Sequence, residues 1–137
     1  MKLPLSVLAA LVLVALGVVS GAGAANPTYP ARTMKATGFG TVLASSNLQA
    51  LYYWSKEPKG TIRCTGSCAR LWPPLVVPKG TKVPRTRTGI KGTFGTIRRP
   101  DGRFQLTHNG RAVYSYVHEG PRKVLCDDVD GWFVVRV

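Results

Sequence analysis

The chain has 137 residues, of which 45% are hydrophobic and 18% charged, and 19 Lys and Arg against 6 Asp and Glu give a formal net charge of +13. This length excludes more than one domain once a leader is set aside. The few carboxylates, histidines and cysteines stand in no nucleophile-elbow, phosphate-loop or zinc-protease spacing. We therefore expect one non-enzymatic domain with no cofactor and no metal site.

The first 25 residues are predicted to be a signal peptide. Lys2 provides a positive start, residues 5–19 carry no charge, and small residues at Ala22 and Ala24 match a signal-peptidase site. Cleavage removes only Lys2, so 18 basic residues remain against 6 acidic ones, a net charge of +12. The alternative is an uncleaved N-terminal anchor, because residues 3–25 are uncharged and long enough to span a bilayer. The sequence thus predicts export to the medium, the periplasm or the cell envelope, with no membrane span after cleavage.

Residues 26–37 contain two prolines and no apolar periodicity, which predicts a linker ahead of a domain over residues 38–137. That domain begins with two predicted strands separated by a turn at residues 45–47. The second of these strands contains Tyr52 and Trp54 on the same face, because side chains alternate along a strand.

A short helix is predicted near residues 68–72, with Ser67 as its cap and the Pro73-Pro74 pair as its end. Cys64 and Cys68 flank its start. Export brings them into an oxidising compartment, and one turn of chain places their Cα atoms within disulfide range. We expect a Cys64–Cys68 disulfide that holds the turn locally and leaves Cys126 free. The alternative is a redox, metal or haem role for the three cysteines, with His118 as a further ligand.

The segment from Lys79 to Arg103, called the basic segment below, has eight basic residues and one carboxylate, Asp101. Its first part, residues 77–92, has prolines and glycines and is predicted to be a surface loop. Such a segment attracts anionic cell-wall polymer or lipid headgroups with an affinity that falls as salt rises, without specificity for nucleic acid. The candidate anion-binding residues are Lys79, Lys82, Arg85, Arg87, Lys91, Arg98, Arg99 and Arg103.

Residues 93–117 contain three apolar runs separated by turns at residues 100–102 and 108–110. The Asp-Gly and Asn-Gly pairs in these turns supply the positive φ angles of tight hairpins, which predicts a three-stranded antiparallel meander. Residues 131–137 are predicted to form a final strand.

The chain matches itself at a shift of 62 positions. "NLQALYYWSKE" from Asn47 aligns with "NGRAVYSYVHE" from Asn109, so that two tyrosines, two further aromatic residues and two glutamates coincide. The predicted fold is therefore mainly β: an internally duplicated antiparallel domain with repeats over about 38–78 and 93–137 and one short helix.

The doubled Y-x-[FWY]-x-x-[DE] pattern, with "CTGSCARLWPPL" after its first copy, resembles the bacterial secreted-repeat proteins, which are predicted exported proteins or lipoproteins. The chain departs from that pattern in carrying Glu57 and Glu119 in place of Asp, in lacking a lipoprotein cysteine and in having Cys126. The resemblance implies export and a duplicated β-rich domain, but it does not indicate which activity the chain has. The motif residues, expected to be structural, are Tyr52, Trp54, Glu57, Tyr114, Tyr116, Glu119, Trp72 and Trp132.

Two alternatives concern these motif residues. Glu57 and Glu119 could act as an acid–base pair, but carboxylates just beyond a strand more often accept backbone N–H groups or pair with Arg. The aromatic rings could form a stacking platform for sugars or bases, but packing in a core accounts for most of them. We therefore expect an exported envelope protein that binds anionic polymer or lipid through a basic face.

Overall fold

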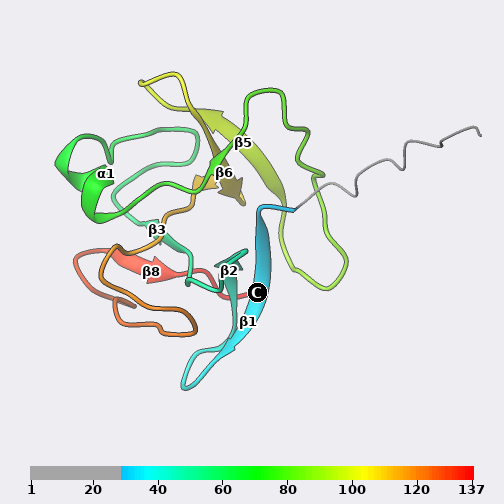
Figure 1. The fold of residues 1–137 in the computed structure, drawn as a ribbon, viewed down its shortest axis with the longest axis vertical. Coiled ribbons are helices and arrows are strands. Elements are labelled where there is room, and N and C mark those ends of the chain that lie inside the picture. Colours follow the sequence, from blue (N-terminus) through cyan, green and yellow to red (C-terminus); the bar gives the residue numbers. More distant parts are fainter. Residues whose placement is uncertain (1–28) are drawn as a thin grey trace, which may run out of the picture.

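A computed structural model describes residues 29–137, and the predicted signal peptide lies outside the described residues. The protein is mainly β with one short helix, as predicted (Figure 1). Its elements are β1 (Ala31–Ala36), β2 (Gly40–Ser45), β3 (Tyr52–Trp54), α1 (Ser67–Leu71), β4 (Val76–Val77), β5 (Phe94–Arg98), β6 (Phe104–His108), β7 (Arg111–Ala112) and β8 (Trp132–Val134).

The strands form three small antiparallel sheets. β1 pairs with β2, β3 pairs with β8, and β4, β6 and β5 lie in that order with β7 added to β6. The expected meander is present as β5, β6 and β7, although its third strand is short. Asn109 and Gly110, with φ of 51° and 79°, make the tight turn between β6 and β7 that the Asn-Gly pair predicts.

Strand β1 corrects the expectation of a linker over residues 26–37. Residues 31–36 pair with β2 along their whole length, from Ala31 opposite Ser45 to Ala36 opposite Gly40. Ala31, Met34 and Ala36 are buried. Small and flexible side chains fill this part of the core, so the segment lacks the alternation of large apolar residues that usually marks a strand.

The core is centred on Tyr52 and Tyr114, which are both fully buried. Their backbones pair directly: Tyr52 N–H donates to the Tyr114 carbonyl at 2.8 Å, and Tyr114 N–H donates to the Tyr52 carbonyl at 2.9 Å. Trp72 and Trp132 stack beside them with ring centroids 3.9 Å apart. A second apolar cluster, around Leu43, Leu51, Leu106, Val113 and Val135, lies next to this aromatic centre.

Helix α1 and the disulfide between Cys64 and Cys68 form a compact unit, called the disulfide corner below (residues 64–71). Gly66, with φ of 58°, is the N-cap, and Ser67 is the first helical residue without a side-chain capping bond, so the expected Ser67 cap is wrong. The amide of Trp72 donates to the Cys68 carbonyl at 2.8 Å. The prolines that follow end the helix, and the unit delivers Trp72 into the core.

A long connection runs from residue 78 to residue 93 between β4 and β5, and it is called the basic loop below. Figure 1 shows it as an extended excursion beside the start of β1. Two bonds fix this position: the Tyr29 hydroxyl donates to the Pro84 carbonyl at 3.1 Å, and Arg87 donates to the Ala31 carbonyl at 2.6 Å. The N-terminal segment and the first part of the basic segment therefore lie together.

Candidate functional site

The two motif glutamates are buried and bind the tyrosine of the opposite half of the chain. The Tyr52 hydroxyl donates to Oε2 of Glu119 at 2.6 Å, and the Tyr114 hydroxyl donates to both carboxylate oxygens of Glu57 at 2.9 Å. Glu57 also accepts the amides of Arg63 and Cys64, and Glu119 accepts the amide of Leu125. Each carboxylate thus links a core tyrosine to the backbone of the loop that follows it.

The electrostatics of these pairs favour a structural role. Burial raises the pKa of Glu119 above its usual value, and its Oε1 has no hydrogen-bond partner. Burial together with the neighbouring carboxylate also raises the pKa of Tyr52 and of Tyr114. Both phenols therefore stay protonated and serve as hydrogen-bond donors to the carboxylates.

The motif aromatics pack on one another. Tyr52 meets Trp72 edge-on at 5.4 Å between ring centroids, and Tyr114 meets Trp132 in the same way at 5.2 Å. The half-buried ring of Trp54 stacks on Trp132, and that of Tyr116 packs against Trp72. These rings form a continuous layer of mutually packed side chains. They therefore contribute to the core and do not form an open platform for a ligand.

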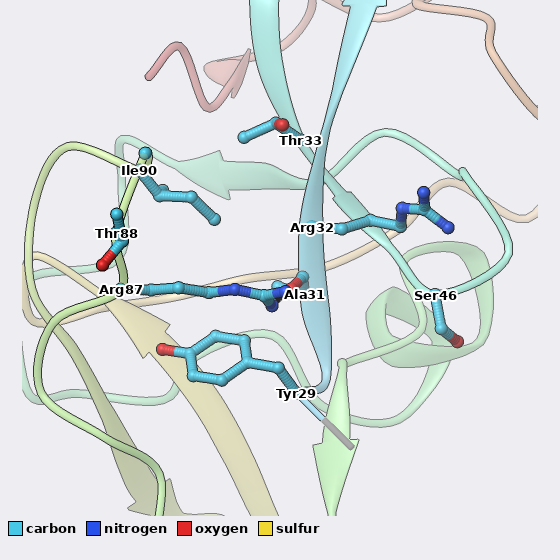
Figure 2. A pocket seen from close by; sticks show the side chains of 9 residues that line it. Tyr29, Ala31, Arg32, Thr33, Ser46, Arg87, Thr88 and Ile90 are labelled. Carbon is cyan, nitrogen blue, oxygen red and sulfur yellow. Dashed lines mark hydrogen bonds between the residues drawn. The ribbon is translucent and has the colours of Figure 1, made fainter. Parts of the chain in front are cut away.

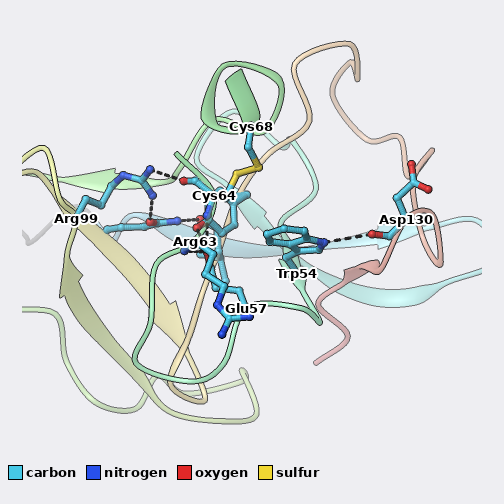
Figure 3. The surroundings of a disulfide bond; sticks show 10 residues. Trp54, Glu57, Arg63, Cys64, Cys68, Arg99 and Asp130 are labelled. Atoms are coloured by element: carbon cyan, nitrogen blue, oxygen red, sulfur yellow. Dashed lines mark hydrogen bonds between the residues drawn. A yellow bond between two sulfur atoms is a disulfide. The ribbon is translucent and has the colours of Figure 1, made fainter. Parts of the chain in front are cut away.

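The expected disulfide between Cys64 and Cys68 is confirmed, with Cα atoms 5.2 Å apart (Figure 3). Cys126 is free and buried. Burial, with smaller contributions from the carboxylates of Glu119 and Asp130, raises the pKa of the Cys126 thiol. The thiolate that nucleophilic or redox chemistry needs is therefore disfavoured at this position.

The two histidines lie in different environments. A ring nitrogen of His108 lies 2.8 Å from the Lys91 carbonyl, and His118 packs edge-on against the ring of Tyr116. Within residues 29–137, no three His, Cys, Asp or Glu side chains are grouped closely enough to hold a metal ion.

Seven of the eight candidate anion-binding residues are exposed, and Arg99 is the exception. Only 3% of Arg99 is exposed. Its guanidinium donates to Oε1 of Gln105 at 2.6 Å and to the Cys64 carbonyl at 2.7 Å (Figure 3). The expectation that Arg99 belongs to an open basic surface is therefore corrected: it braces the disulfide corner against β6.

The carboxylates of the described chain are mostly engaged. Glu57 and Glu119 are buried in the tyrosine pairs, and Asp127 forms an ion pair with Arg136 at 2.7 Å. Asp101 pairs with Arg103 at 2.8 Å, and the hydrogen bonds from Arg103 hold the pKa of Asp101 below its usual range. No ion pair within residues 29–137 involves the candidates Lys79, Lys82, Arg85, Arg87, Lys91 or Arg98.

One cavity, of about 470 Å³, lies between the basic loop and β1. Figure 2 shows Arg87 reaching across it toward Tyr29 and Ala31, while Arg32 points to the other side of the strand. The Arg87 guanidinium lies 4.4 Å from the centre of the Tyr29 ring. Arg87 is therefore held in place by the strand it faces, whereas the other bases of the loop extend into solvent.

A second group of cations was not predicted. Lys59, Arg111 and Arg136 line a cavity of about 520 Å³ together with Tyr53 and His108. These bases come from three distant parts of the chain, so no local charge run marks them. The contact that brings the first two together, Gly60 N–H to the Gly110 carbonyl at 3.0 Å, joins two turns across the domain.

Comparison of the chain with models of known protein families, with curated proteins and with solved structures finds no match. In the part of the chain from Tyr29 onward, no helix has the length and apolar character needed to cross a bilayer.

Proposed function

We propose that this protein is an exported, non-enzymatic component of the cell envelope that binds anionic polymer or lipid headgroups through a basic face. The single observation that carries the proposal is the basic loop: it carries five exposed basic residues, of which all but Arg87 extend into solvent, and none forms an ion pair with a carboxylate in the described region. Unpaired surface cations attract polyanions and release counterions on binding.

Export is supported by the leader pattern at the sequence level, and the Cys64–Cys68 disulfide is compatible with an oxidising compartment. The resemblance to the secreted-repeat proteins points in the same direction and rests on the motif residues alone. The alternative role, a redox, metal or haem protein that uses the cysteines, predicts stoichiometric metal or haem in protein purified from the envelope or the medium.

We further propose that the domain arose by internal duplication. Contacts that recur at the same 62-residue shift support this. The Gly60 amide donates to the Gly110 carbonyl, and the Arg122 amide donates to the Leu48 carbonyl. The same shift relates side-chain bonds: Gln49 donates to the Glu119 carbonyl as Arg111 donates to the Glu57 carbonyl. Swapped contacts of this kind are what two copies packed around one core would make.

The binding proposal is tested by measuring retention of the exported protein on an immobilised glycerol-phosphate polymer and on vesicles containing phosphatidylglycerol. Comparison of the two assays distinguishes polymer binding from lipid binding. Retention should weaken strongly between about 50 and 200 mM salt. The triple variant Lys79→Glu, Lys82→Glu, Arg85→Glu should abolish it. A matched control, Lys35→Glu, Lys56→Glu, Lys123→Glu, changes the net charge equally at exposed positions elsewhere and should retain most of it. Salt-insensitive retention, or equal loss in both variants, would contradict a localised basic face.

A further inference from the structure

A smaller cavity, of about 280 Å³, lies between the disulfide corner and the turn that joins β5 to β6. Thr65 and Arg70 line it on the side of the corner, and Arg99, Asp101 and Arg103 line it on the side of the turn. The disulfide holds the first wall, and the hairpin holds the second. The cavity is therefore bounded by two parts of the fold that are fixed by covalent or backbone bonds.

Arg99 presents an unused donor here. Its two terminal nitrogens are occupied by Gln105 and the Cys64 carbonyl, whereas its Nε is buried and has no hydrogen-bond partner. The nearest carboxylate oxygen, Oδ2 of Asp101, lies 3.9 Å from Nε, which is too far for a hydrogen bond. A buried donor without an acceptor is rare in folded proteins, and this one belongs to a residue that lines the cavity.

The charges around the cavity leave an excess of positive charge. Asp101 is held by Arg103, whose Nε and Nη2 approach its Oδ2 at 2.9 and 2.8 Å. Arg70 is exposed at the opposite wall and forms no ion pair within the described residues. Three arginines thus line the cavity together with one carboxylate, which also accepts the Arg103 amide at Oδ1 and still has free lone pairs.

We propose that this cavity binds a phosphate ester of a polyol or sugar, an inference that rests on the proposed function and gives it a defined site. A phosphate oxygen accepts the free N–H of Arg99 Nε, and the Arg70 guanidinium neutralises the phosphate charge. A hydroxyl of the alcohol portion donates to Asp101. Such a group requires a donor, a cation and an acceptor together, and Arg99, Arg70 and Asp101 supply them in the lining of one cavity.

Titration of the mature protein with glycerol 1-phosphate, followed by NMR of the arginine Nε–H signals, tests the site directly. The Arg99 Nε–H signal should shift in a saturable manner, while glycerol, which lacks the phosphate, should leave it unchanged. Inorganic phosphate, which lacks the alcohol, should bind more weakly. An Arg99 signal that does not move, or shifts spread without saturation over all exposed basic residues, would overturn the proposal.

The variant Arg70→Ala should weaken this binding by about tenfold, because it removes one charge-assisted hydrogen bond. Lys79→Ala, which removes a charge of the basic loop outside the cavity, should leave it unchanged, and equal effects of the two variants would overturn the site. The outcomes for binding in the cavity and for retention on the polymer can be distinguished. If the polymer is retained but glycerol 1-phosphate does not shift Arg99, this inference fails and the proposed function stands. If glycerol 1-phosphate binds but the protein is not retained on the polymer, this inference stands and the proposed function fails.

Discussion

The hydroxyl of Tyr52 donates a 2.6 Å hydrogen bond to Oε2 of Glu119, a residue 67 positions away in the chain. The converse bond joins Tyr114 to Glu57 at 2.9 Å. Each glutamate also accepts backbone amides from the loop beyond it, so a single carboxylate holds both a core ring and a loop. These two residue pairs tie the first half of the domain to the second.

Tyr52→Phe is expected to lower the free energy of unfolding by about 1–2 kcal/mol, because the buried Glu119 loses one of its hydrogen-bond donors. Urea denaturation followed by tryptophan fluorescence measures this. Tyr53→Phe, a change at the neighbouring half-buried ring, serves as the control and should stay within about 0.5 kcal/mol of the parent. A Tyr52→Phe protein as stable as the parent would show that the hydrogen bond between Tyr52 and Glu119 contributes nothing to the free energy of unfolding.

The stability of the domain should depend on the protonation of Glu119. Its pKa is raised above 4.5 in the folded state, so its protonated form stabilises the fold. That contribution is fully present below about pH 4.5 and is lost as the pH rises through the folded-state pKa. Unfolding free energies measured from about pH 4 to about pH 7 should fall more steeply for the parent than for Glu119→Gln. Asp128→Asn, at an exposed carboxylate, should keep the slope of the parent, and identical slopes for all three proteins would contradict this assignment.

Arg122 has a left-handed backbone conformation, with φ of 62°, at the position that matches Gly60, with φ of 73°. A side chain is strained there and glycine is not, so Arg122→Gly should be more stable than Arg122→Ala by about 1 kcal/mol. Both variants remove the same charge, which leaves the backbone as the difference between them. Thermal and urea unfolding measure the difference in stability between the two variants. An alanine variant as stable as the glycine variant would refute the backbone strain at this position.

Removal of the disulfide by the double change Cys64→Ala, Cys68→Ala should lower the free energy of unfolding by about 2 kcal/mol, the chain-entropy value for so short a loop. The loss should be local and should appear as a change in the near-ultraviolet circular dichroism of Trp72, which follows the disulfide corner directly. Cys126→Ala is the control that removes the buried free thiol and leaves the disulfide in place. Peptide mapping of unreduced protein that links Cys126 to either partner would contradict the pairing.

Asp130→Cys is expected to create a second disulfide with Cys126. The pair 126 and 130 has the spacing of 64 and 68, and Asp128 between them has φ of 59°, close to the 58° of Gly66. The two loops differ at their last residue, since Asp130 has φ of 51° and Cys68 lies in α1. Only the backbone carbonyl of Asp130 is bound, by Nε1 of Trp54, so the substitution leaves that contact intact. Thiol titration of the oxidised variant should find no free cysteine. A thiol that persists after oxidation would show that the second loop lacks the geometry of the first.

The local features of the chain were predictable because they depend on a few adjacent residues. The Asn109-Gly110 turn and the helix ended by Pro73 follow from backbone preferences that act within a single turn. The disulfide was predictable for the same reason, since a four-residue spacing keeps Cys64 and Cys68 within reach of each other.

Features that depend on tertiary contacts were not predictable. Strand β1 is held by its pairing with β2, and its buried residues, Ala31, Met34 and Ala36, do not give the alternation of large apolar side chains that marks a strand. Arg99 lies in a run of charges, yet the Cys64 carbonyl and Gln105 satisfy it inside the protein. The cluster of Lys59, Arg111 and Arg136 forms only when distant turns meet. A charge count cannot tell a solvated arginine from a buried one, because the partners lie far away in the sequence.

The pairing of β3 with β8 has a consequence for how the chain reaches its native state. β3 acquires this neighbour only from residues 132–134, so this sheet, unlike the β1–β2 sheet, cannot form until the second half of the chain has been delivered. Contacts of such long sequence separation close late and make folding slow. Under the export proposed above, slow closure is an advantage, since a secretion channel threads an unfolded polypeptide. The order of the strands therefore delays completion of the β3–β8 sheet until β8 is available to pair.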